Sequence, residues 1–268
     1  MSDLIYETRD GIAYLTMDRP RRRNAISPQM MVELADAWRA FRDDPDARVA
    51  ILTGAGNRAF CAGADLELLI PLLTRARAPE DEWDRRLLSD RGLTDVALLR
   101  GFELYKPVVA AVNGWALAGG TEILQATDIR IASPDAHFGL TEAARGLVPG
   151  GGSLARLQRQ IPYCKAMEIL LVGDPIPAEE AHRIGLINEI VPAEKLLIRT
   201  EEIARRIAAN GPFAVRKIKE TLIRTSGLPL ARAFEIESEC ARQVMRSEDA
   251  REGPRAFMEK RTPDFTGR

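Results

Sequence analysis

The sequence predicts an α/β fold with a largely parallel sheet, followed by a helical C-terminal region. Three apolar, β-branched runs, RVAILTGAG (48–56), KPVVAAVNG (106–114) and DIRIAS (128–133), are separated by segments with helical spacing. Alternating strands and helices are typical of βα units, whose strands pair in parallel. After residue 192 the pattern is almost wholly helical. We therefore expect an α/β core that carries the active site over residues 1–195 and a helical region over residues 196–268.

The N-terminal residues predict a hairpin and then a helix. Asp10-Gly11 separates two short alternating segments and favours a type I′ turn, which needs positive φ at both central residues. Ser27 is a good N-cap, and Pro28 suits the first helical position. Apolar side chains then repeat at helical spacing at Met30, Leu34, Trp38 and Phe41.

Two later regions are less regular. Residues 66–105 are charged, have helical patterns and contain Pro71 and Pro79, which predicts one or two surface helices with a mobile joint. LINEIV (186–191) is a weaker strand candidate.

The C-terminal region predicts four helical segments, at 201–212, 213–225, 230–245 and 251–261. An amphipathic face in the third runs through Leu230, Phe234, Glu237, Ala241 and Val244. This face is expected to pack either on the core or on a neighbouring subunit.

Composition excludes several classes of protein. The 268 residues carry a net charge of −1, so nothing favours electrostatic capture of nucleic acid. Three separated cysteines without CxxC spacing predict reduced thiols, and two histidines are too few for a histidine-rich metal site. No signal peptide is recognisable at the start, and no apolar run reaches the roughly 20 residues that span a bilayer. We expect a soluble, cytoplasmic protein with no metal and no membrane partner.

Three glycine-containing stretches follow predicted strands: GAGNRAFCAGAD (54–65), NGWALAGGTE (113–122) and VPGGGS (148–153). The first contains G-x-G but lacks the third glycine of a dinucleotide fingerprint. Such loops can instead free backbone N–H groups. The amides of Ala64 and Gly119 are predicted to converge on one oxygen as an oxyanion hole.

Two glutamates are candidates for acid–base chemistry beside those loops. Glu122 lies within one helical turn of Gly119, and Glu142 follows DIRIAS and the turn SPDAHFGL, which could bring it back to face Glu122. Paired carboxyl groups in an apolar pocket can serve as base and acid. The spacing alone leaves open whether they form such a pair or are two surface helix residues.

At this point the sequence resembles the enoyl-CoA hydratase/isomerase (crotonase) superfamily, from about residue 4 to the C-terminus. The matching motifs stand in the family's order: RPRRRNAI (19–26), AFCAGADL (59–66), KPVVAAVNGWALAGGTEIL (106–124), DIRIASPDAHFGLTEAARGLVPGGG (128–152), AEEAHRIGLINEIV (178–191) and REGPRAFMEKR (251–261). The resemblance implies a crotonase-like spiral of ββα units and a C-terminal helical region for trimerisation. A homotrimer or a dimer of trimers is the implied assembly.

The resemblance also implies a ligand and residue roles. Coenzyme A thioesters are the ligands, and no separate cofactor is required. By resemblance, Ala64 and Gly119 supply the oxyanion amides, Glu122 activates water, and Glu142 delivers a proton to the α-carbon. Further contacts to water or substrate are implied for Ala62, Asp65, Leu66, Gly150 and Lys260. In some family members the lysine at the position of Lys260 reaches the coenzyme's phosphates, and it could do so from a neighbouring subunit.

The resemblance implies an enoyl-CoA hydratase that adds water reversibly, in a syn sense, to a 2-enoyl-CoA. Alternatives are a Δ3,Δ2-enoyl-CoA isomerase, a carnitinyl-CoA-type dehydratase, or an acyl-CoA binder without catalysis. Glu67 stands where a lysine is common among the mitochondrial hydratases, so a charge contact to the coenzyme phosphates from that position is lost. Arg21, Arg22 and Arg23 could compensate. The region from Ala64 to Lys106 looks longer than in short-chain hydratases, so acyl chain length does not transfer.

Overall fold

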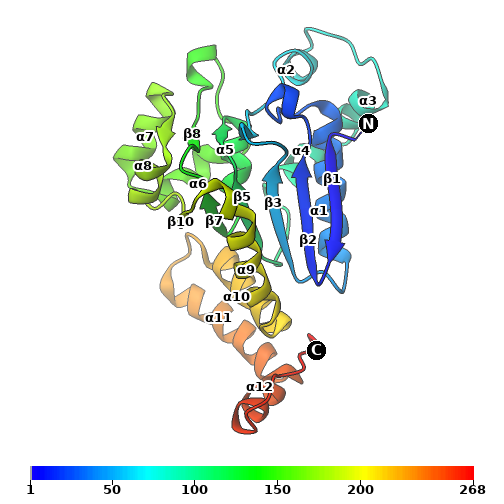
Figure 1. Ribbon diagram of the computed structural model, residues 1–268, viewed down its shortest axis with the longest axis vertical. Helices are drawn as coiled ribbons and strands as arrows, with labels where there is room; N and C mark the ends of the chain where they lie inside the picture. The colour runs from blue at the N-terminus through cyan, green and yellow to red at the C-terminus, as the bar shows by residue number, and fades with distance from the viewer. Residues whose placement is uncertain (1) are drawn as a thin grey trace.

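The computed structural model describes residues 2–268, and a parallel sheet forms the centre of the fold (Figure 1). Its six strands run in the order β1-β2-β3-β5-β7-β10. All neighbouring pairs are parallel except β1 and β2. The strands are β1 (Leu4–Arg9), β2 (Ile12–Met17), β3 (Val49–Gly54), β5 (Val108–Val112), β7 (Ile129–Ala132) and β10 (Glu189–Ile190). The predicted α/β class is therefore confirmed.

The structure contains a second, smaller sheet that the residue patterns did not predict. It has the order β4-β6-β8-β9 and consists of β4 (Ala59–Cys61), β6 (Trp115–Leu117), β8 (His137–Gly139) and β9 (Ile176–Pro177). These strands are two or three residues long and lie among glycines, so they carry no readable alternation. The chain adds a strand to the large sheet and then one to the small sheet in each turn, as in β3–β4, β5–β6 and β7–β8. This is the ββα spiral that the resemblance implied.

The N-terminal hairpin and first helix form as predicted. Asp10 and Gly11 have φ values of 51° and 74°, and β1 pairs with β2 in an antiparallel register. Helix α1 (Pro28–Asp43) begins after Ser27, whose side chain accepts a hydrogen bond of 3.0 Å from the Met30 amide. The four apolar side chains at helical spacing, Met30, Leu34, Trp38 and Phe41, are fully buried.

Residues 66–105 form three short helices, where one or two were predicted. They are α2 (Leu69–Leu73), α3 (Glu82–Ser89) and α4 (Leu93–Ala97), and α3 and α4 pack against α1. The joint between α2 and α3 is held by Arg77. Its guanidinium donates to both carboxylate oxygens of Asp84 and to the carbonyl of Leu68. The mobility of this joint stays a prediction.

Helix α9 (Leu196–Ala208) covers one face of the large sheet. Leu196 and Ala204 join a buried cluster with residues of β2, β3, β5 and β7. The larger cluster lies on the other face, under α1. Because α9 packs on the sheet, it lies with the core although it follows residue 195, and the predicted domain division remains a prediction.

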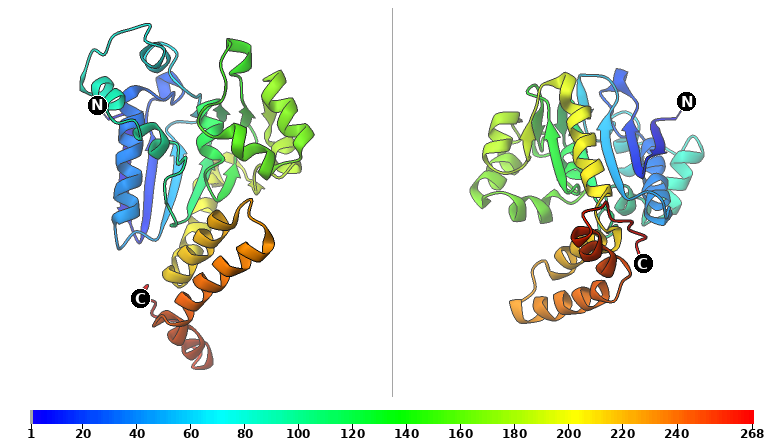
Figure 2. Two further views of the ribbon diagram at one scale, coloured as in Figure 1. Left: turned by 180° about the vertical axis from the view of Figure 1, so that it is seen from behind. Right: turned by 60° about the horizontal axis from the view of Figure 1, so that its bottom comes forward.

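The last three helices project from one end of the core (Figures 1 and 2). They are α10 (Pro212–Thr225), α11 (Leu230–Met245) and α12 (Asp249–Met258). Helix α11 lies along α10 and buries Ile236 and Cys240. Leu230 and Phe234 remain 72% and 57% exposed, so the amphipathic face of α11 does not pack on the core. None of the helices within residues 2–268 is both long and apolar enough to cross a membrane.

Candidate functional site

The backbone N–H of Ala64 points away from Ile26, the residue with which Ala64 forms a parallel bridge. Ile26 donates its N–H to the Gly63 carbonyl at 2.8 Å, and Asp65 donates to the Ile26 carbonyl at 2.9 Å. In this parallel bridge the residues on either side of Ala64 make the bonds. The N–H of Ala64 itself therefore points the other way.

The amide of Gly119 is also freed by its position. Gly119 is the first residue of α5 (Gly119–Leu124), where an N–H has no acceptor within the helix. The preceding Ala118 has φ 48° and ψ −124°, a conformation rarely adopted by residues other than glycine. Strain of this kind costs on the order of 1–3 kcal/mol and is commonly found at functional sites.

The two loops meet, so the two amides lie close together. A β-carbon on Gly119 would be 3.7 Å from the Ala64 nitrogen, and one on Gly63 would be 3.1 Å from the Gly119 nitrogen. Two neighbouring N–H donors without strand or helix acceptors can stabilise a negatively charged oxygen. The structure thus brings together the two amides that the sequence singled out.

The second glycine of the pair serves packing. A β-carbon on Gly120 would lie 2.1 Å from the carbonyl oxygen of Cys61. Only glycine lets α5 approach β4 this closely. Helix α5 can then carry Glu122 next to the converging amides.

Glu122 is buried, with 4% of its surface exposed. Its carboxylate accepts a hydrogen bond of 3.2 Å from the amide of Ser153, the first residue of α6 (Ser153–Gln160). Burial raises the pKa of Glu122, and the Ser153 amide opposes that rise. The net effect is a raised pKa for a carboxyl group that a backbone donor holds in place.

Glu142 is buried as well, with 8% exposed, and lies between β8 and the short helix η2 (Ala143–Arg145). Within residues 2–268, its Oε2 atom has no hydrogen-bond partner. Burial raises the pKa of Glu142 to about 7; its own amide opposes the rise and the nearby Glu122 charge adds to it. A carboxyl group with this pKa can hold or release a proton near neutral pH.

In the glycine run after Glu142, Gly150 was expected to hold water through its backbone, and the structure places the neighbouring Gly151 against Glu122. Gly150 is exposed, and its carbonyl accepts a hydrogen bond of 2.7 Å from Arg100. A β-carbon on Gly151 would instead lie 2.8 Å from Glu122 Oε2. Sequence reasoning missed Gly151 and Ser153. The run of three glycines was the available signal, but nothing in it indicated which one faces the carboxylate. A contact of Gly150 with water stays a prediction.

Three predicted substrate contacts near Ala64 differ in burial: Asp65 is buried, Ala62 is half-buried and Leu66 is exposed. Asp65 is buried and pairs with Arg19 at 2.9 Å, and the amides of Glu67 and Leu68 donate to it. Burial would raise the pKa of Asp65, but these partners outweigh it and lower the pKa. Its side chain is thus engaged by the protein. Ala62 is half-buried beside this loop, whereas Leu66 is 57% exposed. A substrate contact for any of the three stays a prediction.

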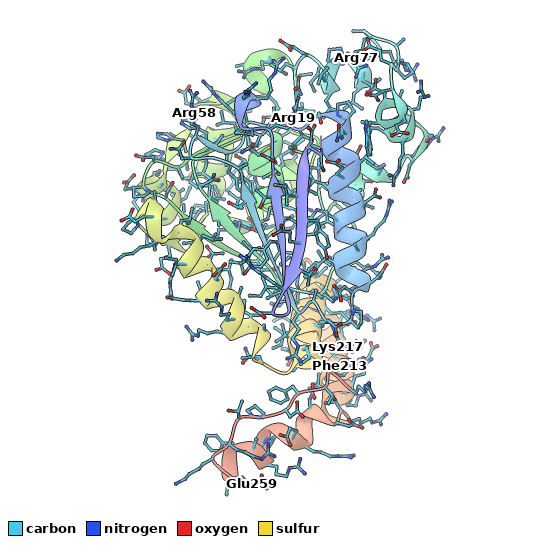
Figure 3. The ribbon with its side chains drawn as sticks, turned by 45° about the vertical axis from the view of Figure 1, so that its right-hand side comes forward. Arg19, Arg58, Arg77, Phe213, Lys217 and Glu259 are labelled. Atoms are coloured by element: carbon cyan, nitrogen blue, oxygen red, sulfur yellow. The ribbon has the colours of Figure 1, made fainter. Side chains whose placement is uncertain are left out.

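Lys260 lies far from these residues within the same chain. It is exposed and follows α12, at the opposite end of the molecule from α5 (Figure 1). Figure 3 shows the same separation between Arg19 and Glu259, the neighbour of Lys260. A contact from Lys260 to a ligand at this site would therefore have to come from a neighbouring subunit.

Within residues 2–268 no group of three or more His, Cys, Asp or Glu side chains is arranged to hold a metal ion.

The fold and site together define the class: an α/β enzyme of crotonase-like architecture, in which two loops and two buried glutamates meet. The family model for enoyl-CoA hydratase/isomerase matches residues 7–268. The chain belongs to this family.

Individual relatives agree with this assignment. An enoyl-CoA hydratase of Mycobacterium tuberculosis is 45% identical over 99% of this chain and 97% of its own length. A carnitinyl-CoA dehydratase of Proteus mirabilis is 39% identical over 97% of each chain. A crystal structure of an enoyl-CoA hydratase from M. tuberculosis H37Rv superimposes with a TM-score of 0.89, at 38% identity and with both chains fully covered.

Proposed function

We propose that this protein catalyses the reversible syn addition of water to a 2-enoyl-CoA thioester, giving a 3-hydroxyacyl-CoA. The observation that carries the proposal is that the freed amides of Ala64 and Gly119 lie together, with the buried Glu122 on the same helix as Gly119. The buried Glu142 interacts electrostatically with Glu122, and its Oε2 has no hydrogen-bond partner among residues 2–268. The enoyl-CoA hydratase among the relatives supports the choice of substrate class.

The proposed mechanism assigns a role to each group. The Glu122 carboxylate takes a proton from water as the water oxygen bonds to C3. The C2–C3 π pair shifts toward the carbonyl and gives an enolate, whose oxygen accepts hydrogen bonds from Ala64 and Gly119. Carbon C2 then takes a proton from the carboxyl group of Glu142. Glu122 ends protonated and Glu142 ionised, and a proton exchange restores both.

The oxyanion contacts would be the largest catalytic contribution. The enolate oxygen carries more negative charge than the ground-state carbonyl, so fixed donors stabilise the transition state more than the substrate. One such donor is typically worth about 2.7–4 kcal/mol of the barrier. No cofactor is needed, because the addition is redox-neutral and coenzyme A is part of the substrate.

A second candidate is dehydration of a substituted 3-hydroxyacyl-CoA. It is the same chemistry in reverse, and the dehydratase among the relatives favours it. A Δ3,Δ2-enoyl-CoA isomerase is less well supported, because shifting a double bond needs one acid–base group where this site has two.

The test is a panel of 2-enoyl-CoA thioesters that vary in length and branching. We expect the absorbance of the conjugated enoyl group to fall, and the product to gain the mass of one water, for at least one member. If water is never added but 3-enoyl-CoA is converted to 2-enoyl-CoA, the protein is an isomerase. Binding of every thioester without any turnover would identify a non-catalytic binder.

A further inference from the structure

Arg156 lies one turn into α6, behind the carboxylate of Glu122. Its Nη2 donates to the Leu99 carbonyl at 2.5 Å, and its Nη1 donates to the Leu98 carbonyl at 3.3 Å. The same Nη1 is 3.5 Å from the carbonyl oxygens of Glu122 and Gly151. One guanidinium therefore joins the end of α4, helix α5 and the glycine turn.

Two glycines of the turn before α6, Gly151 and Gly152, leave space for the side chains of Glu122 and Arg156. A β-carbon on Gly151 would be 2.8 Å from Glu122 Oε2, and one on Gly152 would be 2.7 Å from Arg156 Nη1. Each glycine thus gives space to one charged group, the first to the carboxylate and the second to the guanidinium. Side chains at these positions would separate both groups from the turn.

The segment that Arg156 holds also forms a wall beside Glu122. The Leu98 Cδ1 atom would be 2.7 Å from a β-carbon on Gly151, so Leu98 and Glu122 meet over the same residue. Leu99 has φ 52°, an uncommon conformation for a residue other than glycine. The hydrogen bonds from Arg156 to both carbonyls stabilise this bend and hence the position of Leu98.

We propose that Arg156 is a positioning residue for Glu122, which holds the carboxylate, the glycine turn and the Leu98 wall in one arrangement. The role in turnover rests on the proposed hydratase function. Arginine suits this task better than lysine, because its planar fork reaches several carbonyls at once.

The charge of Arg156 acts on Glu122 in addition. Burial raises the pKa of Glu122, whereas the amides of Gly151, Gly152 and Ser153 and the Arg156 charge lower it. Glu142 interacts electrostatically with Glu122, and Arg145 acts in turn on Glu142. Arg100 acts on Arg156 and lowers the pKa of that guanidinium. Arg156 therefore favours the ionised form of Glu122, the form that can accept a proton from water.

The experiment compares Arg156→Gln and Arg156→Lys with Arg159→Gln, an exposed arginine on the same helix. Kinetics are measured as kcat and KM across pH on a thioester that the wild type hydrates. The Glu122 carboxyl is titrated by ¹³C NMR, in a Glu142→Gln background, to follow its pKa without turnover.

For Arg156→Gln we expect kcat to fall about 10–100-fold with little change in KM, because a small displacement of a catalytic group is costly. The apparent pKa on the acidic side of the kcat/KM pH profile should rise by as much as about one unit, and so should the pKa of Glu122 in the NMR titration. In Arg156→Lys the acidic pKa of the kcat/KM profile should stay near the wild-type value, because the charge remains. The value of kcat should still fall. Arg159→Gln should match the wild type.

The proposal would be overturned if both Arg156 variants kept the wild-type kcat, the wild-type acidic pKa of the kcat/KM profile and the wild-type pKa of Glu122. If Arg156→Gln does not fold, Arg156→Lys decides, since unchanged kcat in that variant contradicts a positioning role. If the wild type hydrates no thioester, the proposed function has failed. The Glu122 titration in Arg156→Gln then still tests the inference, and an unshifted pKa of Glu122 in that variant would contradict it.

Discussion

Glu142 is the residue at which function and stability conflict most directly. Its carboxyl group is buried, and its Oε2 lacks a partner among the described residues. Burial raises its pKa to about 7, so the folded protein holds a proton there that the unfolded chain releases near pH 4.5. The stability contributed by this proton is complete below about pH 4.5 and is lost as pH rises through about 7.

Glu142→Gln therefore has opposite effects on activity and stability. Turnover should fall by roughly 10²–10⁴, because an acid–base group is lost, while acyl-CoA binding persists. Above pH 7 the variant should be more stable than the wild type by about 2–3 kcal/mol, because glutamine is never ionised. Below pH 4.5 the two should melt alike. Steady-state kinetics and thermal melts across pH check both effects, and unaltered turnover would remove Glu142 from the mechanism.

Gly119→Pro tests the proposed role of the Gly119 amide in the oxyanion hole. Proline is tolerated at the first position of a helix but has no N–H, so one donor is lost. We expect kcat to fall by about 10²–10³. Gly119→Ala is the matched control, because it keeps the N–H and its β-carbon would meet neighbours at 3.5 Å or more. Near wild-type kcat in a folded proline variant, measured with the same thioester, would show that this amide is not used.

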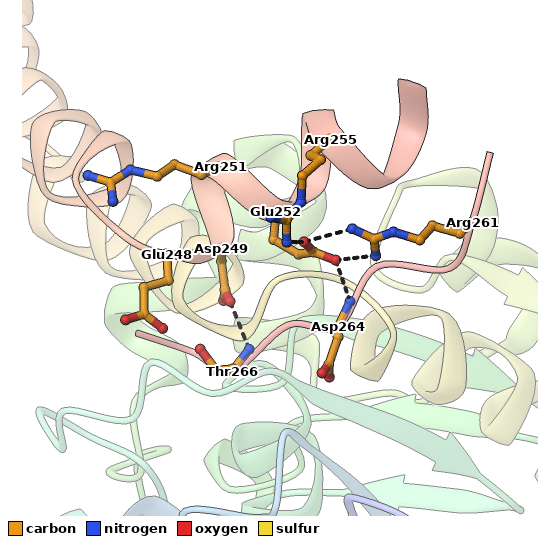
Figure 4. Close-up of a pocket in the computed structure, with 8 residues that line it drawn as sticks. All are labelled: Glu248, Asp249, Arg251, Glu252, Arg255, Arg261, Asp264 and Thr266. Atoms are coloured by element: carbon orange, nitrogen blue, oxygen red, sulfur yellow. Dashed lines mark hydrogen bonds and ion pairs between the residues drawn. The ribbon is translucent and has the colours of Figure 1, made fainter. Parts of the chain in front are cut away.

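At the scale of elements, carboxylates at the start of α12 tie the C-terminal segment to the tail helix (Figure 4). Asp249 accepts hydrogen bonds from the amides of Thr266 and Gly267 at 2.8 and 3.0 Å. Arg48 reaches from the core to the carbonyl of Phe265 at 3.0 Å. The segment therefore connects α12 to the α/β core.

Asp249→Ala should loosen this connection without unfolding the core. Hydrogen bonds to a charged group contribute about 1.5–3 kcal/mol each, so local opening of α12 should become easier by a few kcal/mol. Hydrogen exchange in peptides from α12 should accelerate, while exchange in β3 and β5 stays unchanged. Glu248→Ala, at an exposed neighbouring carboxylate, is the control. Equal exchange in the two variants would contradict the role of Asp249.

At the scale of the whole molecule, the tail leaves a large apolar surface uncovered. Ile218, Leu222, Leu230 and Phe234 are 62%, 68%, 72% and 57% exposed. Apolar surface of this extent on a projecting element indicates contact with another protein chain. We propose that the chain forms a homotrimer or a dimer of trimers through this surface. In such an assembly Lys260 could reach the site of a neighbour.

Phe234→Glu should break this assembly, because a charge buried at a subunit contact is costly. Light scattering should show a trimer or hexamer for the wild type and smaller species for the variant. Arg232→Glu, two residues away and on the opposite side of α11, should keep the wild-type mass. A monomeric wild type at micromolar concentration would contradict the proposed assembly.

The sequence by itself determined the features that depend on neighbouring residues. The Asp10-Gly11 turn, the Ser27 cap and the buried strands were readable because turn chemistry, capping and periodicity are local. The tertiary structure decided the small sheet, the three helices of residues 66–105, the approach of Gly151 to Glu122, and the hydrogen bonds from Arg156 to Leu98 and Leu99. These depend on contacts between segments distant in sequence. The pKa of Glu142 depends on burial and on a charge from another helix, and no local pattern records either.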